Sequence, residues 1–312
     1  MKKFGFVFPG QGSQKLGMLR ELASEFDIVE KTFAEGSAEL DMDLWQITQL
    51  DEENQLDLTH ITQPILLSAS VAIWRAWNQL GGPQPSILAG HSLGEYSALV
   101  CAGVLEFREA VKIVFHRGKF MQAVAPAGNG KMAAIVGLEN HQIDSLCAEA
   151  SGNEVVSAAN YNSPGQTVIA GHVLAVDRAI ELCKSAGAKR ALPLNVSVPS
   201  HCALMKPAAD QLAQALSSVR FSPAAIPVVQ NVNAEISGSP EDIRLNLVRQ
   251  LYQPVQWVDS IRLLHKAGVN KLVECGPGKV LSGLVKRIEP EIACFGSDDG
   301  ISLKNALAEM AT

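Results

Sequence analysis

The chain has 312 residues, of which 47% are hydrophobic and 19% are charged, and its formal net charge is −6. This is the composition of an ordinary globular protein that can bury a large core. A negative charge without any basic cluster argues against a nucleic-acid-binding protein. No apolar stretch is long enough to span a bilayer, and the N-terminal apolar run stops at Pro9, too early for a signal peptide. We therefore expect a cytoplasmic protein that does not enter a membrane.

The N-terminal part of the chain alternates strand-like and helix-like segments. Residues 4–8 form an apolar run that predicts a buried strand, the loop 9–14 follows, and helical periodicity covers residues 64–80. A second short strand is expected at 87–89, directly before another helix. This alternation predicts an α/β fold with a largely parallel sheet, of the α/β-hydrolase-like type.

The most informative motif is the turn Gly90-His91-Ser92-Leu93-Gly94 between that second strand and the following helix. Glycines allow a sharp strand–turn–helix in which Ser92 projects outward, as in a nucleophile elbow. The N–H of Leu93 at the helix start can then stabilise an oxyanion. The loop after the first strand lacks the third glycine of a phosphate-binding loop, and can instead supply a second donor, the N–H of Gln11 or a neighbour. The alternative for Ser92 is an ordinary strand–helix turn.

One arginine lies beside the apolar face of the helix predicted over 106–124. Arg117 falls on the shoulder of a stripe that includes Val111, Val114 and Met121. A guanidinium held against apolar neighbours needs an anion, and its planar fork suits a carboxylate. We interpret Arg117 as a residue that binds an acidic substrate. The alternatives are an internal Asp or Glu partner, or a side chain that extends to solvent.

The middle of the chain differs in composition and in the order of its predicted segments. Residues 125–130 have the composition of a linker, and the following segments read strand, helix, strand, strand, helix, strand up to residue 196. This βαββαβ order is ferredoxin-like. We therefore predict a small subdomain over 125–200, inserted into a large one made of 1–124 and 201–312. The active site is expected in the cleft between the two.

A serine hydroxyl needs a base to become a nucleophile, and His201 is the candidate that the organisation of the chain favours. Of the seven histidines, it lies where the predicted insertion ends and the chain re-enters the large subdomain. Ligand sites form preferentially at such boundaries. The alternative is a hydrogen-bonded structural histidine. The histidines and the six scattered cysteines show no ligand or disulfide spacing, so we expect reduced thiols and no metal.

Five motifs occur in the order of a known family: residues 8–14, 90–96, 162–166, 199–201 and 274–278. Over essentially its whole length the chain resembles the malonyl-CoA:acyl carrier protein transacylases of bacterial fatty acid synthesis. The resemblance implies a ping-pong reaction. Ser92 takes a malonyl group from malonyl-CoA and passes it to the phosphopantetheine thiol of holo acyl carrier protein, with no resident cofactor.

The resemblance also implies roles for individual residues. His201 would be the general base, oriented by the main-chain carbonyl of Gln250, and the N–H groups of Gln11 and Leu93 would hold the oxyanion. Arg117 would pair with the malonyl carboxylate. Four further residues would border the acyl pocket: Met121, Asn160, Gln166 and Ser200. Related polyketide acyltransferase domains that select malonyl often carry a bulky aromatic residue in place of Ser200, so the exclusion of methylmalonyl stays open.

An acidic carrier protein must dock on an enzyme that is itself net negative, so a local basic site is expected. Lys286 and Arg287 are the first candidates, and Lys189 and Arg190 the second. Ordinary solvated surface charge is the alternative. We expect the chain to act as a monomer.

Other functions stay open at this stage. A serine hydrolase would use the same Ser92 and His201 but would need an acid before the histidine, and Asp177 is poorly placed for that role. A non-enzymatic acyl-binding subunit would explain the pocket but not the elbow. A malonate decarboxylase or polyketide system would use the same chemistry in another pathway.

Overall fold

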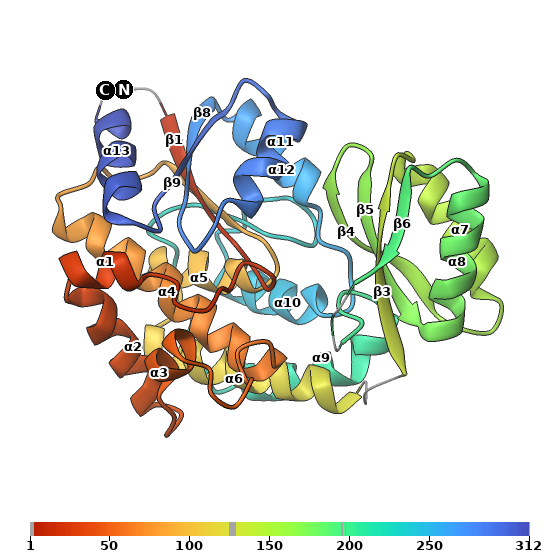
Figure 1. Ribbon diagram of the computed structural model, residues 1–312, viewed down its shortest axis with the longest axis horizontal. Coiled ribbons are helices and arrows are strands. Elements are labelled where there is room, and N and C mark those ends of the chain that lie inside the picture. Colours follow the sequence, from red (N-terminus) through yellow and green to blue (C-terminus); the bar gives the residue numbers. More distant parts are fainter. Residues whose placement is uncertain (1–2, 125–128, 195, 197, 312) are drawn as a thin grey trace.

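The computed structural model describes residues 3–124, 129–194, 196 and 198–311. These residues form two separate sheets with helices packed around them (Figure 1). The linker expected at 125–130 falls mostly outside the described residues. The last strand predicted for the small subdomain, over 190–196, includes residue 195, which also lies outside them.

The larger sheet has five strands in the order β7-β2-β1-β8-β9, and all of them are parallel. The carboxyl ends of parallel strands share one edge of a sheet, and ligands of open α/β folds bind at that edge. Because Val7 lies opposite Ala89, the loops that follow β1 and β2 start side by side. The strands are β1 (Lys3–Phe8), β2 (Ile87–Gly90), β7 (Val228–Val229), β8 (Val269–Glu274) and β9 (Ala293–Gly296).

Helices pack on both faces of this sheet, because β1 is apolar on both sides. Phe4, Phe6 and Phe8 belong to one core cluster, and Val7 belongs to a second cluster on the opposite face. The helices of the first cluster are α1 (Arg20–Glu25), α2 (Ile28–Ala38), α3 (Leu44–Gln49), α4 (Thr59–Gln79), α5 (Leu93–Cys101), α6 (Phe107–Val124), α9 (Lys206–Leu216), α10 (Pro240–Gln250) and α13 (Gly300–Met310). Those of the second are α11 (Trp257–Lys266) and α12 (Val280–Ile288).

The second sheet is antiparallel, with the strand order β4-β5-β3-β6. Its two helices contribute to one apolar cluster with the strands. The elements are β3 (Gly130–Val136), α7 (Asn140–Ser151), β4 (Val156–Ser163), β5 (Gln166–His172), α8 (Val173–Ser185) and β6 (Arg190–Pro193). The βαββαβ order and the mixed α/β class are thus confirmed. The subdomain boundaries themselves stay a prediction.

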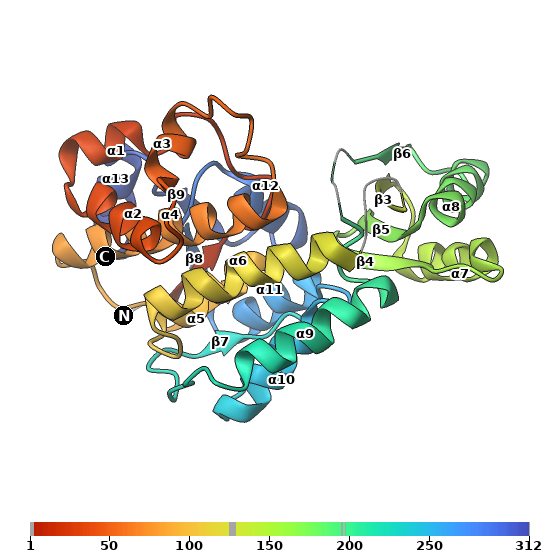
Figure 2. The ribbon, with the colours of Figure 1, turned by 90° about the horizontal axis from the view of Figure 1, so that it is seen from below.

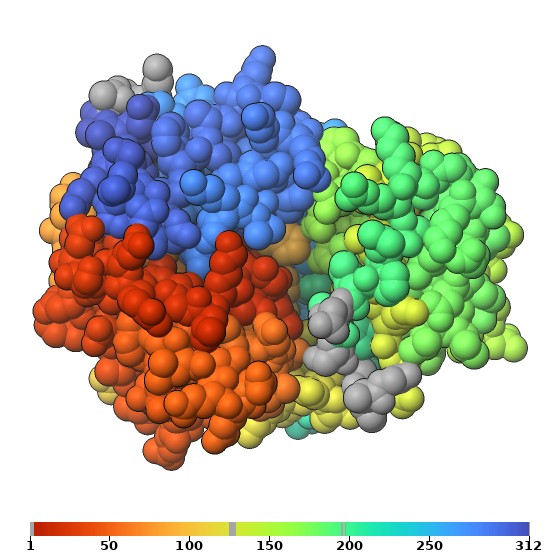
Figure 3. All heavy atoms as spheres, viewed as in Figure 1, coloured from red at the N-terminus to blue at the C-terminus, as the bar shows by residue number. Residues whose placement is uncertain are grey.

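Several contacts connect the small sheet to the rest of the protein, among them those of β4 with α11 and α12. The long helix α6 runs toward the small sheet, and α9 packs along it (Figure 2). The end of β4 also reaches the other part: the N–H of Tyr161 donates to the carbonyl of Val255, and the N–H of Val255 donates to Ala159. A recess opens between the green residues of the small sheet and the red and blue residues of the larger part (Figure 3).

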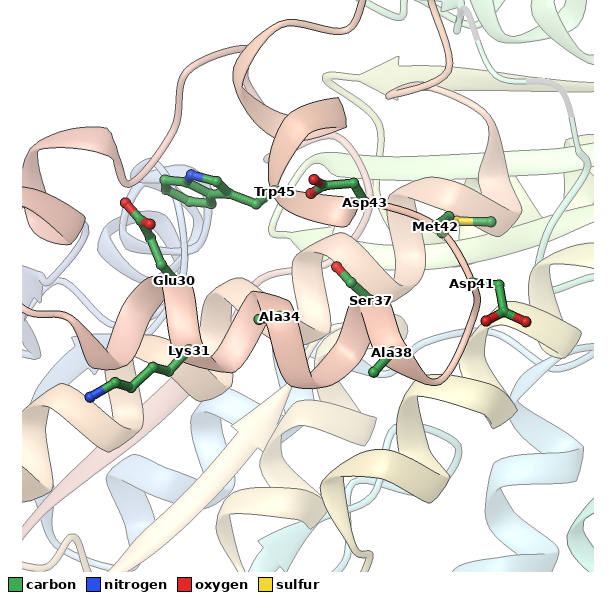
Figure 4. Close-up of a pocket in the computed structure, with 9 residues that line it drawn as sticks. All are labelled: Glu30, Lys31, Ala34, Ser37, Ala38, Asp41, Met42, Asp43 and Trp45. Atoms are coloured by element: carbon green, nitrogen blue, oxygen red, sulfur yellow. The ribbon is translucent and has the colours of Figure 1, made fainter.

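No helix in the described residues has the length and apolar character that crossing a bilayer requires. A surface hollow of about 690 Å³ lies beside α2 and the start of α3, where Ala34, Met42 and Trp45 are among its lining residues (Figure 4). None of the predicted site residues lines it.

Candidate active site

The turn that carries Ser92 is imposed by two glycines and close main-chain contacts. A Cβ on Gly94 would lie 2.0 Å from the carbonyl oxygen of Phe8, and a Cβ on Gly90 would lie 2.0 Å from the main chain of Gly94. No larger residue fits at either position without moving the backbone. Ser92 itself has φ 52° and ψ −108°, a conformation that L residues adopt rarely and that is associated with functional sites. The geometry is that of a nucleophile elbow.

Ser92 and His201 are in hydrogen-bond contact, although they are far apart in the sequence. The distance between Ser92 Oγ and His201 Nε2 is 2.8 Å. On the other side of the ring, Nδ1 lies 2.6 Å from the main-chain oxygen of Gln250. Because a carbonyl oxygen can only accept, Nδ1 carries the hydrogen and Nε2 accepts from the serine hydroxyl. The structure thus brings Ser92, His201 and Gln250 together in the arrangement of a nucleophile, a base and an orienting group.

The environment keeps His201 neutral. Burial and, next, the positive charge of Arg117 lower the pKa of His201 to about 3. The neutral imidazole is the form that can take a proton from Ser92. No carboxylate contacts the ring in the described part of the chain: Asp177 lies on α8, where its Oδ1 accepts a 2.5 Å hydrogen bond from Lys131. The acid of a serine-hydrolase triad is therefore not supplied by Asp177.

Arg117 is buried beside the serine, with 2% of its surface exposed. Its Nη2 lies 3.3 Å from Ser92 Oγ. Two uncharged amide oxygens hold the guanidinium: Nη1 donates to Gln63 Oε1 at 2.7 Å, and Nη2 donates to Gln250 Oε1 at 2.9 Å. Its hydrogen bonds within the described residues include no carboxylate, and the side chain does not extend to solvent. Glu95 interacts with it through charge alone, without a salt bridge. A buried cation without an anion can bind one from a ligand.

Three buried polar residues around this group were not found by sequence reasoning: Gln63, Glu95 and Asn231. The Oδ1 of Asn231 accepts from the N–H of Ser92 at 2.7 Å, and its Nδ2 donates to the carbonyl of Gly90 at 2.6 Å, so this side chain bridges the first residue of the elbow and the serine. Glu95 gave a local signal, because it is a charged residue in the otherwise apolar helix α5. Asn231 gave none, because only the pairing of β7 with β2 brings it close.

The other residues predicted for the oxyanion and the pocket lie around this edge of the sheet. Leu93 is the first residue of α5, so its N–H has no acceptor within the helix. Gln11 is exposed in the loop after β1, where its side chain donates to Thr59. Met121 is buried, and its Sδ lies 3.8 Å from Gln63 Nε2.

The predicted residues from the small sheet and its exit lie farther out. Asn160 is buried on β4 and bridges to Val255, and Ser200 is half-buried in the turn before His201. Gln166 accepts a hydrogen bond from Arg287, so these two residues link β5 to α12. The structure thus pairs an expected pocket residue with an expected docking residue. Within the described residues, neither Gln166 nor Arg287 contacts Ser92.

The buried carboxyl of Glu95 predicts a pH-dependent stability. Burial raises its pKa from 4.5 to about 7. Between these pH values native Glu95 keeps a proton that the unfolded chain has lost, so the free energy of unfolding falls as pH rises through this window. Glu95→Gln removes the effect. Urea unfolding of both proteins should be measured at pH 4.5 and at pH 7.5. Between these pH values the free energy of unfolding of the variant, relative to that of wild type, should rise by roughly 3 kcal/mol. A difference that does not change with pH would contradict the assignment.

Comparison with known proteins identifies the family to which this chain belongs. The family model described as the acyl transferase domain matches residues 5–287. The malonyl CoA-acyl carrier protein transacylase of Salmonella typhimurium is 55% identical over 309 residues, which are 99% of this chain and 100% of that protein. The protein of the same name from Haemophilus influenzae is 54% identical over 311 residues, 99% of both chains. This chain therefore belongs to the malonyl CoA-acyl carrier protein transacylases.

Solved structures agree with this assignment. The malonyl CoA-acyl carrier protein transacylase of Coxiella burnetii has a TM-score of 0.98 at 47% identity, covering 100% of this chain and 98% of that one. A malonyl-transacylase solved in complex with a type II PKS acyl-carrier protein has a TM-score of 0.97 at 55% identity, covering 98% of this chain and 99% of that one. The resemblance read from the five motifs and the two-sheet fold are both confirmed.

Proposed function

We propose that this chain moves a malonyl group from malonyl-CoA to the phosphopantetheine thiol of holo acyl carrier protein, through a malonyl ester on Ser92, in fatty acid synthesis. The observation that carries the proposal is the Arg117 guanidinium, which lies 3.3 Å from Ser92 Oγ without a carboxylate partner in the described residues. Such a cation selects an acyl group that ends in a carboxylate. The names of the relatives support the same reaction.

The acylation step follows from the hydrogen bonds of the site. His201 Nε2 takes the hydroxyl proton while Ser92 Oγ attacks the thioester carbonyl. The N–H groups of Leu93 and Gln11 hold the resulting oxyanion, and each such donor contributes roughly 3 kcal/mol to a transition state of this kind. When the tetrahedral intermediate collapses, the carbon–sulfur bond breaks and the CoA sulfur takes the proton from His201.

The second step reverses the roles. His201 Nε2 takes the proton of the phosphopantetheine thiol, the sulfur attacks the malonyl ester, and Ser92 Oγ leaves with the proton. A carbonyl in place of a carboxylate beside Nδ1 fixes the ring without adding full negative charge. The weaker base is sufficient, because the thioester is activated and its exchange with an ester is nearly balanced.

We place the acyl group in the cleft between the two predicted subdomains. The large subdomain comprises residues 1–124 and 201–312, and the small one comprises residues 125–200. Met121 would form one wall, and the far side would be bordered by Asn160, Gln166 and Ser200. The recess in Figure 3 supports this placement. The small side chain of Ser200 leaves room for a methylmalonyl group. We also propose a monomeric enzyme. A cytoplasmic location stays a prediction.

The fate of the acyl group tests the proposal. Wild-type protein mixed with malonyl-CoA alone should keep its malonyl ester, and adding holo carrier protein should move the group to the carrier. Malonate that accumulates from excess malonyl-CoA without a carrier would show a hydrolase instead. A protein that never forms an ester would leave only acyl binding.

We propose that the carrier docks on Lys286 and Arg287, with Lys189 and Arg190 as the second candidate site. All four are exposed, and Arg287 lies beside the small sheet through its bond to Gln166. Reversing the charges at both sites should weaken transfer at least tenfold at low salt, because an acidic partner loses its electrostatic attraction.

In this docking experiment acylation by malonyl-CoA should change far less than transfer to the carrier, even though Arg287 also bonds to Gln166. Lys31→Glu on α2 is the matched control, since this lysine is also exposed and lies outside both candidate sites. Transfer kinetics that stay the same at low salt would place the docking surface elsewhere.

A further inference from the structure

Glu95 is a buried acid that the proposed mechanism leaves unused. It lies in the first turn of α5 and is 1% exposed. Its Oε2 accepts a 2.6 Å hydrogen bond from Gln250 Nε2 and a 3.2 Å hydrogen bond from the N–H of Asn231, whereas its Oε1 has no partner in the described residues. It forms no salt bridge within those residues. Because burying a carboxyl group is costly, its position needs a reason other than an ion pair.

The reason lies in the side chain of Gln250, whose amide has a donor end and an acceptor end. The donor, Nε2, faces the carboxyl of Glu95, and it also reaches the main-chain oxygen of Ser92 at 3.0 Å and Asn231 Oδ1 at 3.4 Å. The acceptor, Oε1, faces Arg117 Nη2 at 2.9 Å. Turning the amide over would set N–H groups against the guanidinium and oxygen against oxygen. The bonds to Ser92 and Arg117 favour the observed orientation, and the bond to Glu95 is the shortest of those that do.

We propose that Glu95 is a positioning residue for substrate selection. By holding the Gln250 amide, it presents the oxygen that keeps the Arg117 guanidinium beside Ser92, and so sets the preference for acyl groups with a free carboxylate. This inference rests on the proposed function, because it specifies how the site recognises its acyl group. Gln250 then has two tasks: its main-chain oxygen holds His201, and its side-chain oxygen holds Arg117.

The arrangement also keeps a counter-charge at a distance. A carboxylate in direct contact with Arg117 would neutralise the guanidinium and compete with the substrate. Glu95 instead acts through one intervening amide. Its Oε2 stays an acceptor whether or not the other oxygen carries a proton, so the orientation of Gln250 does not depend on the titration of Glu95. For the same reason Glu95→Gln, which keeps an acceptor oxygen, should preserve the orientation.

The test compares the rates of Ser92 acylation by malonyl-CoA and by acetyl-CoA. In Glu95→Leu the Gln250 amide loses its short bond, and the malonyl-to-acetyl ratio of these rates should fall roughly tenfold or more, as expected when a hydrogen bond to a charged group is weakened. Glu95→Gln should keep the ratio within about threefold of wild type. Glu274→Gln is the matched control, because Glu274 is also a buried acid but bonds Leu281 and Ser282 at the start of α12.

Each outcome decides the proposal. A ratio lost in Glu95→Leu and kept in Glu95→Gln supports it. A ratio kept in both, or lost in both, overturns it, because the orientation of Gln250 would then not be what Glu95 supplies. If Glu95→Leu does not fold, Glu95→Asp withdraws the carboxyl from Gln250 by one methylene, and an unchanged ratio there overturns the proposal equally. Failure of wild-type protein to form a malonyl ester would instead reject the proposed function.

Discussion

Replacing His201 with alanine should slow the acylation of Ser92 by malonyl-CoA by roughly 10⁴-fold or more. The expectation follows from the 2.8 Å contact between Ser92 Oγ and His201 Nε2, since no other base contacts the hydroxyl in the described residues. Arg117 also reaches this oxygen, but a guanidinium cannot take a proton. Rapid mixing followed by intact-protein mass measurement gives the rate directly.

The control for His201→Ala is His265→Ala. His265 lies in the last turn of α11 and forms a hydrogen bond with Glu289, not with the serine. Its loss should therefore leave the acylation rate within about threefold of wild type. A loss of less than tenfold in His201→Ala would mean that another group, or water, serves as the base. The role assigned to His201 would then be wrong.

The second large effect is expected from Arg117→Ala. This variant should lose preference for malonyl-CoA over acetyl-CoA by roughly 100-fold, because the carboxylate of the substrate loses a charge-assisted hydrogen-bond partner in a buried site. Acylation by acetyl-CoA should be affected far less. Arg117→Lys should restore the preference only in part, since a lysine cannot use the Gln63 and Gln250 oxygens as a planar fork does.

Arg117→Ala has a second expected consequence. The charge of Arg117 helps to lower the pKa of His201, so its removal should raise that pKa and move the acid limb of acetyl transfer to higher pH. Lys119→Ala is the matched control, because Lys119 is exposed on the same helix. An unchanged malonyl-to-acetyl ratio in Arg117→Ala would refute the carboxylate role, whatever happens to the overall rate.

The parts of the site that the sequence predicts are those with a local signature. The elbow depends on glycines two residues before and after Ser92, and the burial of Arg117 follows from its position on one helix face. His201 is predicted from the order of segments, because the ferredoxin-like insertion is predicted to end just before it. In each case the signal lies within one element or at the boundary of one.

What could not be predicted depends on pairing between distant segments. Asn231 reaches the elbow only because β7 pairs with β2, and the side chain of Gln250 reaches Glu95 from the end of α10. The sequence pointed to the main-chain oxygen of Gln250 by resemblance but not to its side-chain contacts. Periodicity within one segment cannot report such contacts, since they form only in the assembled fold.

Strand ends show the same limit. The predicted strand ended at Ala159 and the predicted turn began at Asn162, whereas β4 continues to Ser163. This boundary was wrong because pairing with β5 and the bonds to Val255 extend the strand. The last strand was expected to reach Val196, but β6 ends at Pro193.

The most direct test of the account is the intact mass of wild-type and Ser92→Ala protein after brief mixing with malonyl-CoA, measured again after holo carrier protein is added. We expect one malonyl adduct on wild type, none on Ser92→Ala, and movement of the adduct to the carrier. An adduct that forms on Ser92→Ala, or one on wild type that the carrier cannot remove, would contradict transfer through Ser92.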